Sequence, residues 1–341
     1  MTAQGTATQR LRSACMSLHA DIPDSLIWYA DDQPGITRRR AGRGFSYIAP
    51  DGTRIDNGAE RKRIEALAVP PAYEDVWISP RANGHLLATG YDARTRKQYR
   101  YHPDYMSFRA RTKFDYLAAF GQALPRIRRR VQEALTQSER DEEFAIAATL
   151  RLMDKASLRV GTPDYATDND TYGATTLRGR HVRLDGNRVR LDYRAKGGQR
   201  VRKQFSDRTL NRALERMGDL PGGALMQYED NVGAVRQLGP EQVNAWLRDA
   251  TGRDGLTAKT FRTWNGSASA LDTVLRADGQ VTIKEMAQAA AEVLHNTPTI
   301  ARNSYIHPEV IALAGSDTRV DTPDRPVGLR LPERALLALL A

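Results

Sequence analysis

Residues 178–206 read RGRHVRLDGNRVRLDYRAKGGQRVRKQFS. Apolar and polar residues alternate along most of this stretch, as they do in strands that bury one face. Asp185-Gly186 and Gly197-Gly198 are turn signals that divide it into shorter segments. The stretch therefore predicts a meander of three strands.

The segments around this meander have the apolar periodicity of helices instead. The predicted helical stretches are residues 107–124, 125–139, 142–160, 207–220, 240–252, 257–277 and 282–296. A small β-meander set into helices is therefore the expected core of the C-terminal part. The tail, residues 316–341, ends in an apolar helical patch that docks either on its own domain or on a partner.

An earlier part of the chain, residues 45–101, consists of short apolar and aromatic runs separated by turns. Asp51-Gly52 and Asn83-Gly84 are hairpin signals, and residues 58–69 fit a short helix. The chain is thus expected to be α+β, with a small β-rich domain followed by a mostly helical one. We place an N-terminal extension at residues 1–24, the β-rich domain at 25–104 and the helical domain at 105–341, with the linker near 102–107.

The charge of the chain favours a polyanionic partner. Its 341 residues include 51 lysines and arginines against 41 acids, so the formal charge is +10. Nucleic acid is the leading candidate, and an anionic membrane surface is the alternative. No stretch approaches the length of a membrane span, and the N-terminus lacks an apolar signal core. We expect a cytoplasmic protein that does not bind membranes.

The sequence gives no support for a metal or a nucleotide cofactor. Cys15 is the single cysteine, which excludes an intramolecular disulfide and a cysteine cluster. No two of the six histidines have the close helical spacing of a zinc site, and neither glycine-rich nucleotide motif is present. We therefore expect no cofactor and chemistry by ordinary side chains.

Tyr305 lies in a polar stretch, HNTPTIARNSYIHPE (residues 295–309), between Pro298 and Pro308. A tyrosine in such an expected loop is usually a surface or packing residue. Cutting a phosphodiester without a metal, however, needs a nucleophile, cations for the phosphoryl oxygens and an acid for the leaving oxygen. Tyrosine suits the first task and arginine the second.

Three motifs, NTPTIARNSYIHPE, KTFRTWNGS and LRVGTPDYATDNDTYGATTLRGRHV, resemble those of type IB DNA topoisomerases. The similarity is greatest to the small bacterial enzymes that look like the poxvirus topoisomerase, and it covers residues 25–315. It implies a helical catalytic domain of the type IB topoisomerase and tyrosine recombinase kind. It also implies that the enzyme cleaves one DNA strand through a 3′-phosphotyrosyl bond, allows strand rotation and reseals the strand, without ATP.

The resemblance implies a role for each matching residue. Tyr305 matches the nucleophile, while Arg159 and Arg262 match the arginines that bind the non-bridging phosphate oxygens. Lys196 matches the lysine of a β-hairpin that protonates the 5′-oxygen. Its neighbours Gly197 and Gly198 permit the close approach of that hairpin to DNA. The alternative for Lys196 is an ordinary basic residue on a solvated hairpin.

Asn296 stands nine residues before Tyr305, where the poxvirus enzyme has histidine. The bacterial branch resembles this chain in having asparagine, which donates a hydrogen bond but no ionised proton. His295 is adjacent, and we interpret it as a structural or surface residue. The basic runs TRRRAGRG and PRIRRRVQ are interpreted as solvated faces, with added phosphate contacts that weaken with salt as the alternative, and we assign them no specific role.

The segment RTRKQYRYHP matches the family segment that contacts DNA in the major groove. The matching residues are Arg96, Gln98, Tyr99 and Tyr101, and Tyr165 matches a further DNA-contacting tyrosine. Strict alternation in a strand places Gln98 and Tyr99 on opposite faces. Either the strand ends there, or one of the two does not contact DNA.

These observations predict a monomeric, nucleoid-associated topoisomerase that closes as a clamp around duplex DNA. A tyrosine recombinase is the first alternative, disfavoured by Asn296 and by the β-rich N-terminal part. A non-catalytic basic DNA-binding protein is the second, and it forms no covalent adduct.

Overall fold

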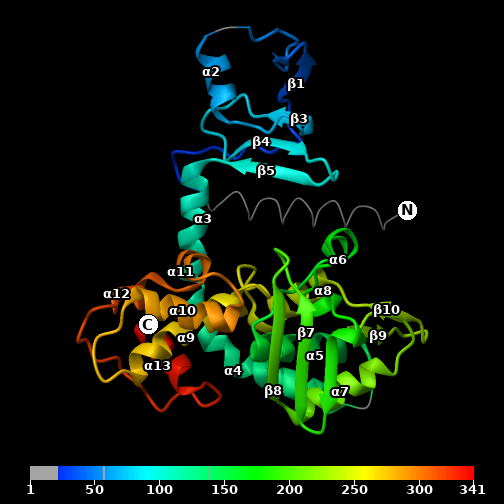
Figure 1. Cartoon of the computed structure of the whole chain (residues 1–341), viewed down its shortest axis with the longest axis vertical. Coiled ribbons are helices and arrows are strands. Elements are labelled where there is room, and N and C mark those ends of the chain that lie inside the picture. Colours follow the sequence, from blue (N-terminus) through cyan, green and yellow to red (C-terminus); the bar gives the residue numbers. More distant parts are fainter. Residues whose placement is uncertain (1–21, 57, 138) are drawn as a thin grey trace. The chain divides into compact units, whose positions relative to one another are not determined.

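The chain divides into two compact units, residues 1–112 and 113–341, and the division falls inside helix α3 (Pro103–Asp115). The computed structural model describes residues 22–56, 58–137 and 139–341, except for the side chains of residues 164 and 165. Figure 1 gives the labels of the helices and strands. Most of the expected N-terminal extension, residues 1–24, lies outside the described residues.

The first unit contains an antiparallel sheet in the order β2-β1-β3-β4-β5. Its strands are β1 (Ile36–Ala41), β2 (Gly44–Ile48), β3 (Glu74–Ile78), β4 (Leu86–Tyr91) and β5 (Lys97–Tyr101). Helix α2 (Ala59–Ala66) buries Ile64 in a cluster with Ile36, Val76 and Ile78. The prediction of a β-rich N-terminal part with one short helix is confirmed.

The second unit is mostly helical (Figure 1). Its helices are α4 (Leu117–Ala134), α5 (Glu142–Ala156), α6 (Pro163–Asn169), α7 (Arg208–Gly218), α8 (Pro240–Thr251), α9 (Thr260–Arg276), α10 (Ile283–Leu294), α11 (Pro298–Tyr305), α12 (Pro308–Ala312) and α13 (Leu331–Leu339). Its largest buried rings meet edge to face, with centroids 4.9 Å apart for Phe120 and Phe261 and 5.9 Å apart for Phe120 and Trp264. These contacts join α4 to α9.

The predicted meander is present as the antiparallel strands β6 (Val182–Asp185), β7 (Arg188–Arg194) and β8 (Arg200–Ser206). One face buries Leu191, Tyr193 and Val201 against the helices. Gly197 and Gly198 have positive φ angles of 83° and 77° in the turn between β7 and β8, which explains why glycine occupies both positions. A second, smaller sheet pairs β9 (Gln227–Glu229) with β10 (Val235–Gln237).

Two details differ from the sequence prediction. The break between successive helices falls at Tyr116, and α4 continues through Pro125, where we expected a new helix to begin. An interior proline loses one backbone hydrogen bond, but α4 continues because it buries a full apolar face that includes Leu117, Phe120 and Leu124.

Tyr305 is the last residue of α11 rather than part of a loop. Thr297 caps this helix by accepting from the Ile300 amide, and Pro298 occupies its first turn.

Candidate active site

The C-terminal ends of α5 and α10 position two of the candidate residues. Each helix is followed by a residue in the left-handed conformation, Ser157 (φ 55°) and His295 (φ 47°). Arg159 lies two residues after Ser157, and Asn296 directly follows His295. The Nη2 atom of Arg159 donates a hydrogen bond to Oδ1 of Asn296 at 2.9 Å, so the two helix ends bring these side chains together.

Arg262 joins the same two helix ends from α9. Its side chain is buried and donates from Nη1 to the carbonyl oxygen of Ser157 and from Nη2 to that of Leu294, the latter at 2.9 Å. The last carbonyls of a helix lack partners within the helix and carry partial negative charge. The guanidinium of Arg262 therefore stabilises both ends and is itself held in a fixed orientation.

Tyr305 lies beside this guanidinium. Its ring centroid is 5.0 Å from Cζ of Arg262, and only 8% of the residue is exposed. Burial alone raises the pKa of the phenol, but the positive charges of Arg262 and Arg159 outweigh it and hold the pKa of Tyr305 below its ordinary value. The tyrosinate is thus easier to form here than in water.

The backbone of Tyr305 is fixed by α9. Oγ of Ser267 donates to the carbonyl oxygen of Tyr305 at 3.1 Å and accepts from the amide of His307 at 2.9 Å. A Cβ atom on Gly266 would lie only 2.9 Å from that same carbonyl oxygen. Glycine at this position therefore permits the close approach of α9 to the end of α11.

Two buried donors at the site have no hydrogen-bond partner among the described residues. They are Nε of Arg262 and Nδ2 of Asn296. A buried donor without a partner is costly, and such groups are rare unless a ligand satisfies them. Together with the charges of Arg159 and Arg262, they give the site the chemistry needed to bind an anion.

The fifth candidate, Lys196, lies in the exposed turn between β7 and β8. The backbone hydrogen bond from the amide of Ala195 to the carbonyl of Gln199, at 2.8 Å, closes this turn. The structure thus brings Arg159, Arg262, Asn296 and Tyr305 together and places Lys196 at the tip of a hairpin. The role of Lys196 as a proton donor stays a prediction.

Lys203 was missed by the sequence analysis. Its Nζ donates to the carbonyl oxygens of Ala156 and Val293, both at 2.6 Å. Burial and the charge of Arg262 lower the pKa of Lys203 to about 8. The signal was present in the alternation of β8, where Lys203 occupies an inward position between Val201 and Phe205.

His295 is neutral at the C-terminal end of α10. Burial, with the positive charges of Lys203 and Arg262, lowers its pKa to about 4. Its left-handed backbone conformation ends the helix and places Asn296 next to Arg159. This position agrees with its interpretation as a structural residue.

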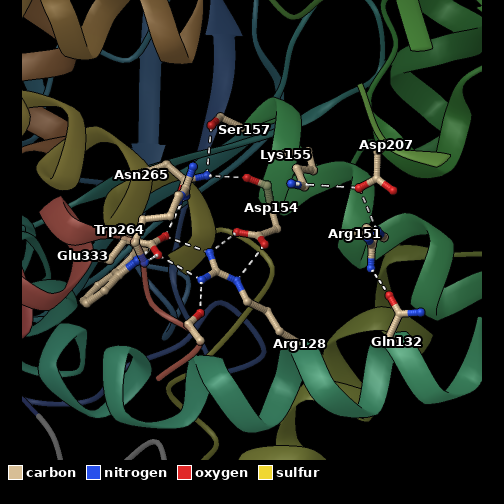
Figure 2. A network of polar contacts seen from close by, with 12 residues as sticks. Arg128, Gln132, Arg151, Asp154, Lys155, Ser157, Asp207, Trp264, Asn265 and Glu333 are labelled. Carbon is tan, nitrogen blue, oxygen red and sulfur yellow. Dashed lines mark hydrogen bonds and ion pairs between the residues drawn. The ribbon is translucent and has the colours of Figure 1, made fainter. Parts of the chain in front are cut away.

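A second polar network contacts the C-terminal end of α5 (Figure 2). Nδ2 of Asn265 donates to the carbonyl of Asp154 at 3.1 Å and to Oγ of Ser157 at 2.9 Å. Arg128 forms a bidentate ion pair with Asp154 and also binds Glu333 of α13 at 2.7 Å.

Our interpretation of Arg128 as part of a solvated basic face was wrong, because its guanidinium lies between the carboxylates of Asp154 and Glu333. The ion pair between Arg128 and Glu333 docks the C-terminal helix α13 on its own unit.

The candidate DNA contacts of the first unit lie on and next to β5. Arg96 and Gln98 both donate to Oδ2 of Asp92, with Arg96 Nη2 at 2.6 Å and Gln98 Nε2 at 3.0 Å. The rings of Tyr99 and Tyr101 are stacked with centroids 6.0 Å apart. Because β5 includes both Gln98 and Tyr99, the two side chains project from opposite faces. The side chain of Tyr165, in α6, lies outside the described residues.

Two further observations concern the described part of the chain. No helix in it is long and apolar enough to cross a membrane. Within the same residues, no three His, Cys, Asp or Glu side chains are grouped so that they could hold a metal ion.

Comparison with known proteins gives two family matches. The family described as eukaryotic DNA topoisomerase I, catalytic core, matches residues 103–304, more than half of the chain. The bacterial DNA topoisomerase IB N-terminal domain matches residues 44–92. The first match ends one residue before Tyr305, so the choice of this tyrosine as a candidate rests on the sequence motif and on the contact with Arg262.

Several similar proteins are of viral or fungal origin. The DNA topoisomerase 1B of Acanthamoeba polyphaga mimivirus is 25% identical over 286 residues, which cover 80% of this chain and 85% of that protein. The DNA topoisomerase 1B of Vaccinia virus (strain Copenhagen) is 20% identical over 262 residues, covering 73% of this chain and 78% of that protein. The DNA topoisomerase 1 of Mycosarcoma maydis is 24% identical over 67% of this chain and 24% of its own length.

Proposed function

The chain belongs to the type IB DNA topoisomerases, and from this membership we propose that it relaxes supercoiled duplex DNA through a transient break held by Tyr305. The break is made in one strand, the free end rotates, and the strand is resealed. Supercoiling strain drives the rotation, and the covalent bond conserves the energy of the phosphodiester. The reaction therefore consumes no ATP, and in this proposal it uses no metal.

Cleavage begins with attack of the Tyr305 phenolate oxygen on the phosphorus atom. A bond forms between Tyr305 and the 3′-phosphate, while the bond from phosphorus to the 5′-oxygen breaks and its electrons leave with that oxygen. Lys196 gives a proton to the leaving oxygen, producing a 5′-hydroxyl. Religation is the reverse: the 5′-hydroxyl attacks the phosphotyrosyl bond and Tyr305 is the leaving group.

Arg159, Arg262 and Asn296 bind the non-bridging phosphate oxygens in this proposal. The observation that carries it is that Arg262 lies beside Tyr305 and Arg159 donates to Asn296, while buried donors of Arg262 and Asn296 lack partners among the described residues. Donors fixed before the reaction stabilise the charge that develops in the transition state, typically by several kcal/mol. The arginines have a second effect, because they also lower the pKa of the nucleophile.

We further propose that the enzyme acts as a monomer in the nucleoid, with its two units forming a clamp around the duplex. The candidate DNA contacts are Arg96, Gln98, Tyr99, Tyr101 and Tyr165. Because Gln98 and Tyr99 project from opposite faces of β5, we propose that only one of these two contacts the DNA. Binding to phosphates releases counterions, so the affinity for DNA should fall steeply as salt is raised. A chain with charge +10 is suited to this mode of binding.

Relaxation of negatively supercoiled plasmid in EDTA without ATP tests the proposal. The wild-type protein should produce a ladder of relaxed topoisomers, and Tyr305→Phe should produce none. Tyr116→Phe, which removes a hydroxyl outside the candidate site, is the matched control and should relax plasmid normally. Plasmid that shifts in mobility without being relaxed, or full activity in Tyr305→Phe, would contradict the proposal.

A further inference from the structure

Three segments of the second unit meet at the ammonium group of Lys203. It extends from β8 and donates to the carbonyl of Ala156 at the end of α5 and to that of Val293 at the end of α10. The next carbonyl along each helix, that of Ser157 and that of Leu294, accepts from Arg262. Two cations therefore bridge consecutive carbonyls of the same two helix ends.

These cations tie the helix ends to different elements. Arg262 belongs to α9, so it joins α5 and α10 to the helix beside Tyr305. Lys203 belongs to β8, so it joins them to the β7–β8 hairpin. Arg159 lies three residues beyond Ala156, and Asn296 lies three residues beyond Val293. Lys203 thus contacts the base of both segments that carry candidate phosphate-binding side chains.

The hairpin itself is a continuous ladder from Lys203 to its tip. Lys203 pairs with Leu191, Val201 with Tyr193 and Arg200 with Arg194, directly before the turn that contains Lys196. A displacement of β8 at Lys203 is therefore passed along the ladder to Lys196. An apolar residue would fill this inward position with a smaller desolvation cost than a lysine. A lysine here is better explained by its two carbonyl contacts.

We propose that Lys203 is a positioning residue of the cleavage reaction, which holds the hairpin that carries Lys196 against the helix ends that carry Arg159 and Asn296. It acts through Lys196 and touches neither the DNA nor the leaving oxygen. The inference rests on the proposed function, because it requires Lys196 to protonate the 5′-oxygen. Arg262 still joins the two helix ends when Lys203 is removed, so the loss should displace mainly the hairpin.

Replacement of the scissile 5′-bridging oxygen by sulfur separates this role from a general structural one. A thiol has a pKa of about 8.5, so a thiolate leaves without the proton that an alkoxide needs. The substrate is a duplex oligonucleotide with oxygen or sulfur at a cleavage site mapped beforehand with the wild-type protein. Single-turnover formation of the covalent complex is measured for Lys203→Met, Lys196→Ala and the control Lys284→Met, an exposed lysine of α10.

Lys203→Met should cleave the oxygen substrate about tenfold to a hundredfold more slowly than the wild type, because small displacements of a catalytic group have effects of this size. Its affinity for DNA should be unchanged. On the sulfur substrate its rate should return to within a few-fold of the wild type, as should that of Lys196→Ala. Lys284→Met should match the wild type on both substrates. Circular dichroism verifies that each variant is folded. If Lys203→Met does not fold, Lys203→Gln, which keeps a hydrogen-bond donor, is used in its place.

The outcomes distinguish the inference from the proposed function beneath it. Rescue by sulfur in Lys196→Ala but not in a folded Lys203 variant overturns the positioning role of Lys203. A wild-type cleavage rate of a folded Lys203→Met protein on the oxygen substrate overturns it as well. Failure of sulfur to rescue Lys196→Ala overturns instead the assignment of Lys196 as the proton donor, and the inference falls with it.

Discussion

Replacing Glu333 with glutamine removes the negative charge of a fully buried carboxylate. The Glu333 carboxylate is 0% exposed and accepts hydrogen bonds from Arg128 at 2.7 and 2.9 Å (Figure 2) and from the Arg330 amide and side chain at 2.7 and 2.6 Å. The glutamine variant keeps the shape of the side chain but directs an NH2 group at donors. The ion pairs that dock α13 on α4 are therefore lost without creating a cavity.

The pKa of Glu333 gives the magnitude of this effect. Burial raises the pKa, but the hydrogen bonds from Arg128 and Arg330 outweigh it and lower the pKa from 4.5 to about 2. At about 1.4 kcal/mol for each pKa unit, the charged carboxylate contributes roughly 3 kcal/mol to the free energy of unfolding at neutral pH. This agrees with the cost of about 3–5 kcal/mol for breaking a buried ion pair.

The pH dependence has a definite sign. The pKa of Glu333 is depressed in the folded state, so its contribution is fully present above the unfolded pKa of about 4.5 and is lost as the pH falls towards 2. The stability difference between the wild type and Glu333→Gln should therefore be about 3 kcal/mol at pH 7. It should decrease to about half of this value between pH 3.5 and 3.

Urea unfolding followed by circular dichroism at 222 nm measures this difference. Glu215→Gln, an exposed glutamate of α7, is the control and should change the stability little. Arg128→Met and the double variant with Glu333→Gln complete a double-mutant cycle, which should give a favourable coupling energy. A loss below about 1 kcal/mol at pH 7, or a loss that does not change between pH 7 and 3, would refute the reasoning.

Three further predictions concern Tyr305 and its surroundings. Gly266→Ala should slow formation of the covalent complex about tenfold to a hundredfold, because its Cβ would lie 2.9 Å from the Tyr305 carbonyl and displace the nucleophile; an unchanged single-turnover rate would contradict this. Arg159→Met should raise the pKa of Tyr305, measured by 13C NMR of labelled tyrosine, because one of the charges that lower it is removed; an unshifted titration would show that Arg159 has no such effect. Between pH 6.5 and about 4, the unfolded and folded pKa of His295, the unfolded chain binds a proton at this residue and the folded chain does not. The free energy of unfolding should therefore decrease as the pH is lowered through this range. His295→Asn should reduce that fall, as read from urea midpoints at pH 7 and 5, and an equally steep fall in the variant would contradict the assignment.

Local patterns were sufficient to predict most of the fold. The meander was recognised because alternation and the turn residues Asp185-Gly186 and Gly197-Gly198 are properties of short segments. The break near Pro125 was misplaced because the apolar face of α4 is a tertiary contribution that overrides the local preference of proline. Tyr305 was assigned to a loop because the short helix α11 contains polar residues and depends on its cap at Thr297.

The site could be predicted only in part. Its residues were found through motifs, but the contact between Arg159 and Asn296 joins positions 137 residues apart, which periodicity does not reveal. The two carboxylate partners of Arg128, Asp154 and Glu333, are 26 and 205 residues away, so its basic run resembled a solvated face. The inward position of Lys203 could have been predicted, because alternation places it on the buried face of β8. It was not singled out because the meander contains many other basic residues.

Identification of the residue that becomes linked to DNA tests the central claim most directly. The protein is trapped on a duplex with a 32P label at the scissile phosphate and a nick that releases the short 5′-hydroxyl strand. It is then digested, and the labelled peptide is identified by mass spectrometry. The account predicts a single 3′-phosphotyrosyl bond at Tyr305, formed in EDTA without ATP. A label on another tyrosine, such as Tyr172 or Tyr193, or no covalent complex at all, would contradict it.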